Sequence, residues 1–162
     1  MFHQARYAQL GPQKEVRNLI PSRGDKAADI YIPDWIQGHD TAFDITVVSP
    51  LQVSHLQRSS KEAGFSLQQR YQEKLSKHED SCRRENIVLA PLVVTTFGSW
   101  HKLAEKQLKN LSRAVATHEG SDSGDVGRNF FGRLSVKLCQ GNAALINSRL
   151  PSLPPPWLSG EQ

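Results

Sequence analysis

The segment IVLAPLVVTTFG, residues 87–98, is the feature that most constrains the fold. Apolar and β-branched side chains run through it without alternation, which is typical of a strand buried on both faces. Apolar residues with helical spacing both precede and follow it. Helices on both faces of a sheet are the economical way to cover such a strand, so we expect it to be a central strand.

Three more strands are expected upstream, each a short run of apolar or β-branched residues. They are predicted at residues 14–20 (KEVRNLI), 28–33 (ADIYIP) and 42–50 (AFDITVVSP). The Gly38-His39-Asp40 sequence between the last two is a turn signal. These two strands should therefore form an antiparallel hairpin with a long loop.

A first long helix is predicted between the hairpin and the 87–98 strand. Ser59-x-x-Glu62 is a possible capping box at its start, and the helix should end near Arg84. Its buried face is the apolar stripe of residues at helical spacing, namely Leu67, Tyr71, Leu75, His78 and Cys82.

Two further helices are predicted after the central strand. One begins at Ser99 and should bury Leu103, Ala104, Leu108, Leu111 and Val115. The polar sequence HEGSDSGDVG is expected to be a mobile loop. The last helix, at residues 126–150, should have a weak point at Gly141-Asn142. The residues that it is expected to direct toward the core are Phe130, Phe131, Leu134, Leu138, Leu145 and Ile146.

The elements together predict an α/β (α+β) fold with a mixed central sheet of about four strands flanked by helices. The order is strand, strand, strand, helix, strand, helix, helix, after a short helix within residues 1–10 that Gly11-Pro12 ends. We expect one domain over residues 1–150. The tail 151–162 (PSLPPPWLSGEQ) should be disordered or polyproline II, with a docking motif for a proline-reading domain as the alternative.

Basic residues are concentrated in the middle third of this chain, whose net charge is +4. Such clustering favours a polyanion partner, although solvated helix faces are the alternative for each residue. The candidate nucleic-acid-binding residues are Arg70, Lys102, Lys106 and Arg113. No apolar run reaches the roughly 20 residues that a membrane span requires, and no secretory signal is recognised, so an intracellular protein is expected.

Two predicted strands each carry an aspartate, which adds nothing to an apolar core. Asp44 lies between Phe43 and Ile45 in a substantially buried strand, where an unpaired carboxylate would be costly. Asp29 opens the preceding strand and can converge with Asp44 across the hairpin. Glu15 could supply a third carboxylate. Such oxygen ligands suit Mg²⁺, although exposed caps or surface ion pairs are the alternative.

Lys74 is unexpected because it falls inside the apolar stripe of its helix. At 100° per residue it lies about 20° from Leu67. Its ammonium could reach the metal site, hold an attacking water or stabilise charge on a phosphate. The alternative is a lysine that extends its head to solvent. Lys77, at the edge of the same face, is the substitute candidate.

The cysteines, the histidines and the known catalytic motifs do not indicate another type of active site or metal site in this sequence. Cys82 and Cys139 lack the spacing of a zinc site, so reduced, partly buried thiols are expected. The motifs of P-loop nucleotide hydrolysis, serine esterases and dinucleotide redox enzymes are absent from the sequence. The histidines have no spacing that joins them, and we expect surface or loop positions for His39, His55, His101 and His118.

Four segments of the chain, taken together, resemble a known family. They are KAADIYIPDWIQGHDTAFDITVVSPLQ, KLSKHEDSC, LAPLVVTTFGSW and FFGRLSVKLCQGNAALINSR. They resemble the restriction-like endonuclease region that follows the reverse transcriptase in non-LTR retrotransposons and related mobile elements. That region belongs to the PD-(D/E)XK nuclease superfamily, and the resemblance covers residues 14–149.

The resemblance implies cleavage of a DNA phosphodiester with Mg²⁺, or alternatively Mn²⁺. Asp29 and Asp44 match the two acids, and Glu15 matches an auxiliary acid of some members. The usual lysine, two residues after the second acid, would fall at Thr46. In members whose lysine has moved to the following helix it occupies a K-x-x-K-[HY] motif, which residues 74–78 match.

The resemblance also implies a nuclear site of action and a reverse transcriptase domain upstream in the same polypeptide. In this chain we expect that domain to be absent and the first helix to be truncated. The expected function is a Mg²⁺-dependent DNA endonuclease domain of mobile-element origin. A catalytically silent nucleic-acid-binding remnant and an interaction module that uses the proline-rich tail remain open as alternatives.

Overall fold

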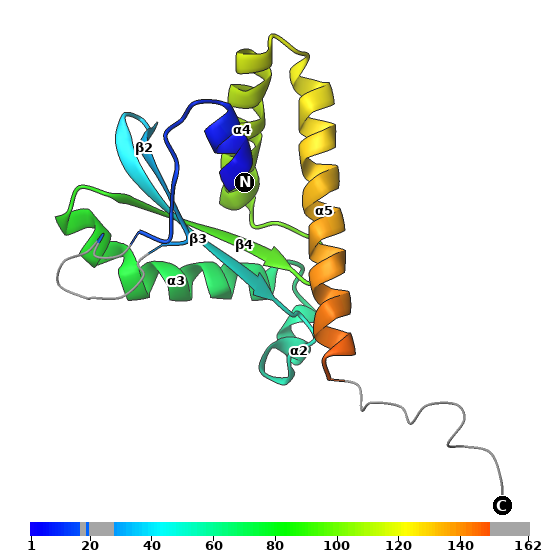
Figure 1. Ribbon diagram of the computed structural model, residues 1–162. Helices are drawn as coiled ribbons and strands as arrows, with labels where there is room; N and C mark the ends of the chain where they lie inside the picture. The colour runs from blue at the N-terminus through cyan, green and yellow to red at the C-terminus, as the bar shows by residue number, and fades with distance from the viewer. Residues whose placement is uncertain (17–18, 20–27, 150–162) are drawn as a thin grey trace, which may run out of the picture.

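The structure, a computed structural model, describes residues 1–16, 19 and 28–149. Its four-stranded sheet has the order β1-β2-β3-β4, with β3 and β4 parallel and the other pairs antiparallel. The predicted α/β class with a mixed, helix-flanked sheet is confirmed (Figure 1). In chain order the elements are α1 (Phe2–Tyr7), β1 (Gln13–Lys14), β2 (Ile30–Ile36), β3 (His39–Val48), α2 (Val53–Ser59), α3 (Phe65–Arg84), β4 (Val88–Thr95), α4 (Lys102–Glu119) and α5 (Ser123–Asn147).

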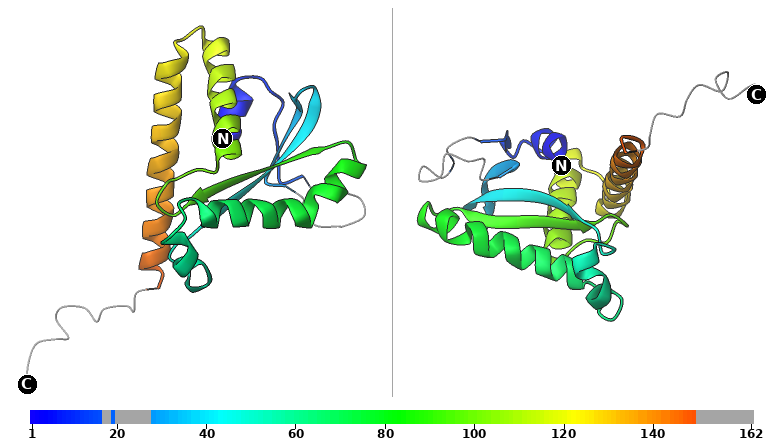
Figure 2. Two further views of the ribbon diagram at one scale, coloured as in Figure 1. Left: turned by 180° about the vertical axis from the view of Figure 1, so that it is seen from behind. Right: turned by 90° about the horizontal axis from the view of Figure 1, so that it is seen from below.

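Helices cover both faces of the sheet. Figures 1 and 2 show α3 along one face and α1 and α4 against the other, with α5 packed beside α4. On the α4 side, Phe43 and Leu92 meet Leu111 in one apolar cluster. On the α3 side, Val93 packs with Tyr71. The parallel β3–β4 pair is joined through α3, as a crossover connection requires.

The hairpin between β2 and β3 is tighter than predicted. Ile36 pairs with His39, so the turn consists of Gln37 and Gly38. Both have positive φ angles, 53° and 76°, as a type I′ turn requires, and this turn matches the twist of antiparallel strands. The expected long loop is therefore wrong, because β3 begins at His39.

Strand β4 is fully covered but is not a central strand. It ends the sheet order in the described part of the chain, beside β3. Its outer edge is partly closed by the following segment, where Trp100 bridges to Val94 and the His101 N–H donates to the Val93 carbonyl at 3.0 Å. The apolar pattern of β4 thus reflects two helix-covered faces rather than two neighbouring strands.

The helix predicted from Ser59 to Arg84 starts later, as α3 at Phe65, and a short helix that was not predicted, α2, precedes it. Helix α2 ends at Ser59, where the capping box was expected to begin a helix, and α3 starts only after Gly64. Gly64 has φ 85°, which residues with a side chain rarely adopt, so the chain turns here between the two helices. The Ser59-x-x-Glu62 sequence is therefore not a capping box.

The predicted mobile loop after α4 is also wrong, because α5 begins at Ser123. The Asp122 carboxylate accepts the N–H groups of Gly124 at 2.9 Å and Asp125 at 3.0 Å, which caps the helix. The helix passes through Gly141-Asn142 without a break. Asn142 Nδ2 donates to the Thr96 carbonyl at 2.7 Å and ties the helix to the end of β4.

Several apolar residues predicted for the core are exposed. Leu145 and Ile146 on α5 are 58% and 61% exposed, because this part of the helix extends beyond α4 (Figure 1). Leu103 on α4 is 49% exposed. On α5, Phe130 is buried as predicted.

The predicted strand at residues 14–20 is observed only in part. Gln13–Lys14 forms β1, and Glu15 and Val16 follow it outside any strand. Most of the remaining residues of that prediction, and the whole tail 151–162, lie outside the described residues.

Candidate functional site

Asp44 and Lys74 meet on the α3 face of the sheet. Because side chains alternate along β3, Asp44 lies on the face opposite to the buried Phe43. Lys74 comes from the middle of α3, and its Nζ is 2.7 Å from Asp44 Oδ2. The two side chains are 21% and 19% exposed. The lysine inside the apolar stripe of its helix is therefore the ion-pair partner of the aspartate inside the buried strand.

The acceptor atom of this pair is shielded from solvent. Asp44 Oδ2 is buried and has no aligned hydrogen-bond donor among the described residues, so the short contact with Lys74 is a charge pair. Thr46, where the superfamily's usual lysine would fall, is 8% exposed on the same face of β3. The ammonium next to Asp44 therefore comes from Lys74 on α3, because β3 has a threonine at the position of the usual lysine.

Asp29 immediately precedes β2, whose first residue, Ile30, pairs with Phe43 of β3. The Asp29 N–H donates to the Phe43 carbonyl at 2.9 Å, and its carboxylate Oδ2 accepts the Ile45 N–H at 2.7 Å. Beyond Phe43, strand β3 pairs only with β4, so one edge of its last residues has no partner strand in the described chain. The Asp29 side chain binds the first N–H of this open edge, on the strand that carries Asp44.

Glu15 is held next to Asp29 through the main chain. Its N–H donates to the Asp29 carbonyl at 3.0 Å, and its side chain is exposed. Within residues 1–16, 19 and 28–149, no three Asp, Glu, His or Cys side chains gather closely enough to hold a metal ion. Asp29 Oδ2 accepts the Ile45 N–H, and Asp44 Oδ2 pairs with Lys74 Nζ. Mg²⁺ is commonly held by one or two carboxylates with water and substrate phosphate. Asp29 and Asp44 carry carboxylate oxygens, the type of donor that this ion binds, and are the residues that could hold it.

The predicted nucleic-acid-binding residues are divided between two surfaces. Arg70 lies on α3, four residues before Lys74 on the same flank, and Lys77, the substitute catalytic candidate, follows Lys74 by three residues. The other candidates are exposed on α4, across the sheet (Figure 2). Those α4 residues are Lys102, Lys106 and Arg113.

Two histidines expected at the surface are buried. His55 on α2 is 7% exposed and His101, before α4, is 8% exposed. The His101 ring stacks on Tyr71 at 4.0 Å between centroids, and its Nε2 is 2.9 Å from Gln68 Oε1. Their burial depends on segments that fold back onto the sheet, which spacing along the chain does not encode.

The His101 environment makes stability depend on pH. Burial lowers the pKa of the imidazole, and the Lys102 ammonium lowers it further. Below about pH 6.5 the unfolded chain binds a proton that the folded chain does not, so the free energy of unfolding should decrease as the pH falls from 7 toward the folded-state pKa. Urea unfolding at pH 7 and 5.5 measures this decrease.

His101→Phe keeps the stacking on Tyr71 and should reduce that decrease, whereas His3→Gln, at an exposed position, should leave it unchanged. Equal pH dependence in the parent and the His101 variant would contradict the assignment.

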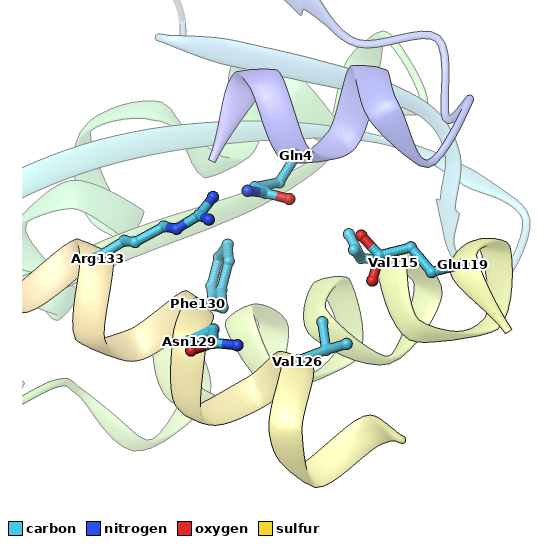
Figure 3. A pocket seen from close by; sticks show the side chains of 7 residues that line it. All are labelled: Gln4, Val115, Glu119, Val126, Asn129, Phe130 and Arg133. Atoms are coloured by element: carbon cyan, nitrogen blue, oxygen red, sulfur yellow. The ribbon is translucent and has the colours of Figure 1, made fainter. Parts of the chain in front are cut away.

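Two cavities flank the sheet on different sides. One, of about 380 Å³, is lined by Arg70 and Glu73 next to Lys74 on α3. The other, of about 100 Å³, lies among α1, α4 and α5, and Figure 3 shows the Phe130 ring and the Arg133 side chain bordering it. This second cavity is too small for a nucleotide and lies across the sheet from Asp44, so it is not part of the candidate site.

Comparison with known proteins found no matching family model, no matching curated protein and no matching solved structure. In the part of the chain that the structure describes, no helix combines the length and the apolar character that crossing a membrane requires.

Proposed function

We propose that this chain is a metal-dependent DNA endonuclease domain of the restriction-like type found with the reverse transcriptases of mobile elements. The observation that carries this proposal is the contact of Lys74 Nζ with Asp44 Oδ2, beside Asp29. An ammonium from the crossover helix and two acids from an antiparallel hairpin form the arrangement that the resemblance implies. The order α1, β1, β2, β3, then α3 and β4, supports it as well.

In this proposal Asp29 and Asp44 would hold Mg²⁺ or, in its place, Mn²⁺. The chemistry that such an ion would supply is Lewis-acid stabilisation of charge on the phosphate and easier deprotonation of the attacking water. Lys74, held in place by Asp44, orients a water or neutralises charge on the phosphate that is cleaved. Lys77 supplies a second positive charge on the same helix, and Glu15 is an auxiliary acid beside Asp29.

DNA is the proposed substrate, and a reverse transcriptase domain in the same polypeptide is the proposed natural partner, acting in the nucleus. The positive flank of α3 supports a polyanion, because Arg70 and Lys77 bracket the Lys74 ammonium. The basic residues of α4 lie across the sheet and would contact a different stretch of nucleic acid.

Binding of nucleic acid without cleavage is the second candidate function. It is favoured by one observation: within the described residues no three possible metal ligands gather, and the Asp44 carboxylate is already paired with Lys74. A domain that had lost catalytic activity would keep the Asp44–Lys74 ion pair for its contribution to stability. It would still bind DNA through its basic residues.

Incubation of the purified protein with supercoiled plasmid distinguishes the two functions. We expect nicked and then linear DNA with Mg²⁺ or Mn²⁺, and no cleavage with EDTA. If the plasmid stays supercoiled with either ion while the protein still binds DNA in a salt-dependent manner, the endonuclease proposal is wrong and the binding function stands.

A further inference from the structure

A polar cavity lies one helical turn from the Asp44–Lys74 pair. It has a volume of about 380 Å³ and is bounded by the end of β3, by α2 and by the first half of α3. Hydroxyl, amide, imidazole and guanidinium groups predominate in its lining, with one carboxylate. Its polar lining includes Ser49, Ser54, His55, Gln69, Arg70 and Glu73.

Glu73 forms an ion pair with Arg70, the positively charged residue that lines this cavity. Arg70 Nη1 is 3.0 Å from Glu73 Oε2, and Gln69 Nε2 donates to Glu73 Oε1 at 3.1 Å. The Arg70 hydrogen bond is the largest cause that lowers the pKa of the Glu73 carboxyl, so this carboxylate is ionised at neutral pH. Both charged side chains are more than two-fifths exposed, so the pair can open at small cost.

His55 is a buried side chain with one ring nitrogen that makes no hydrogen bond within the described residues. Its side chain lines the cavity at 7% exposure, and Nδ1 has no hydrogen-bond partner among the described residues. The ring makes a T-shaped contact with Phe65, with centroids 6.1 Å apart, and the Arg58 guanidinium carbon lies 5.5 Å from the centroid of the Phe65 ring. Buried polar atoms normally have a partner, so this nitrogen, in a residue that lines the cavity, indicates a polar ligand or an ordered water next to the ring.

We infer that this cavity binds the DNA phosphate next to the one at Lys74. Without DNA, Glu73 holds Arg70 in an ion pair, and Arg70 exchanges this carboxylate for the phosphate when DNA binds. The inference rests on the proposed function, since it places a neighbouring phosphate of the same strand. Arg70 and Lys74 are four residues apart on one flank of α3, about 6 Å along the helix axis, which is close to the spacing of successive phosphates.

The chemistry of the lining favours a phosphate over a neutral group. A guanidinium binds phosphate through two parallel hydrogen bonds, and this geometry is stronger than a single contact with one exposed carboxylate. The hydroxyls of Ser49 and Ser54 and the amide of Gln69 add donors around it. When DNA is absent, Glu73 occupies Arg70 in place of the phosphate.

Salt-dependent DNA binding by the full chain tests this inference without requiring cleavage. A short fluorescent duplex is titrated with protein at several KCl concentrations in EDTA. Arg70→Ala should weaken binding and reduce the slope of log Kd against log salt by about 1. Glu73→Gln should give a several-fold lower Kd than the parent, because it removes the competing acceptor.

The Glu79–Arg83 pair provides matched controls, because it is an exposed ion pair of the same helix at 3.1 Å. Glu79→Gln should not lower the Kd as Glu73→Gln does, and Arg83→Ala should leave the salt slope within error of the parent. His55→Phe, which keeps the packing on Phe65, should weaken binding in the same direction as Arg70→Ala.

The outcomes separate this inference from the endonuclease proposal. A lower slope for Arg70→Ala in a protein that never cleaves plasmid supports the subsite and overturns only the endonuclease. Plasmid cleavage with equal slopes for the Arg70 and Arg83 variants overturns the subsite alone. Inorganic phosphate that raises the melting temperature of the parent but not of Arg70→Ala, with equal DNA slopes, also overturns it, because the cavity would then bind free phosphate.

Discussion

Asp44→Asn is expected to reduce Mg²⁺-dependent nicking of supercoiled plasmid by about 10²–10³-fold. The amide keeps the size of the carboxylate but removes the charge that binds both the proposed cation and the Lys74 ammonium, 2.7 Å away. Single-turnover rates with excess protein measure the effect. Circular dichroism should be unchanged, because the side chain is only partly buried and its shape is preserved.

Asp80→Asn is the matched control, since Asp80 is an exposed aspartate on α3. Its nicking rate should equal that of the parent. The double variant Asp44→Asn, Lys74→Ala should be no slower than the slower single variant, because groups that act as a unit are not additive. An Asp44→Asn protein that nicks at the parental rate would exclude the proposed site.

Leu111→Ala is expected to lower the free energy of unfolding by about 2–5 kcal/mol. The Leu111 side chain is 0% exposed in the cluster that joins α4 to Phe43 and Leu92 of the sheet. Its removal leaves a cavity between the helix and the strands, where the backbone of the sheet prevents collapse. Urea unfolding followed by tryptophan fluorescence measures the change.

Leu103→Ala on the same helix is the control for Leu111. Because Leu103 is 49% exposed, its truncation should change stability by no more than about 0.5 kcal/mol. A similar loss in both variants would mean that α4 packs on the sheet through a face different from the one described.

The elements of the fold were largely predictable because their signals are local. An unbroken apolar run predicted a strand covered on both faces at residues 87–98, and β4 is such a strand. The position of β4 at the end of the sheet was not predictable, since covering helices and neighbouring strands give the same apolar pattern. The burial of His55 and His101 was missed for a related reason: it depends on segments packing against each other rather than on periodicity.

The candidate site was likewise predictable only in part from the sequence. The alternation of β3 and the helical period of α3 marked Asp44 and Lys74 as charged residues in apolar patterns, because each period is set by backbone geometry within a few residues. Which charge meets which depends on how the crossover places α3 against β3, and this packing joins Lys74 to Asp44 while leaving Lys102 and Lys106 across the sheet. Backbone periodicity acts along one segment, whereas contacts between segments follow from the burial of the whole core.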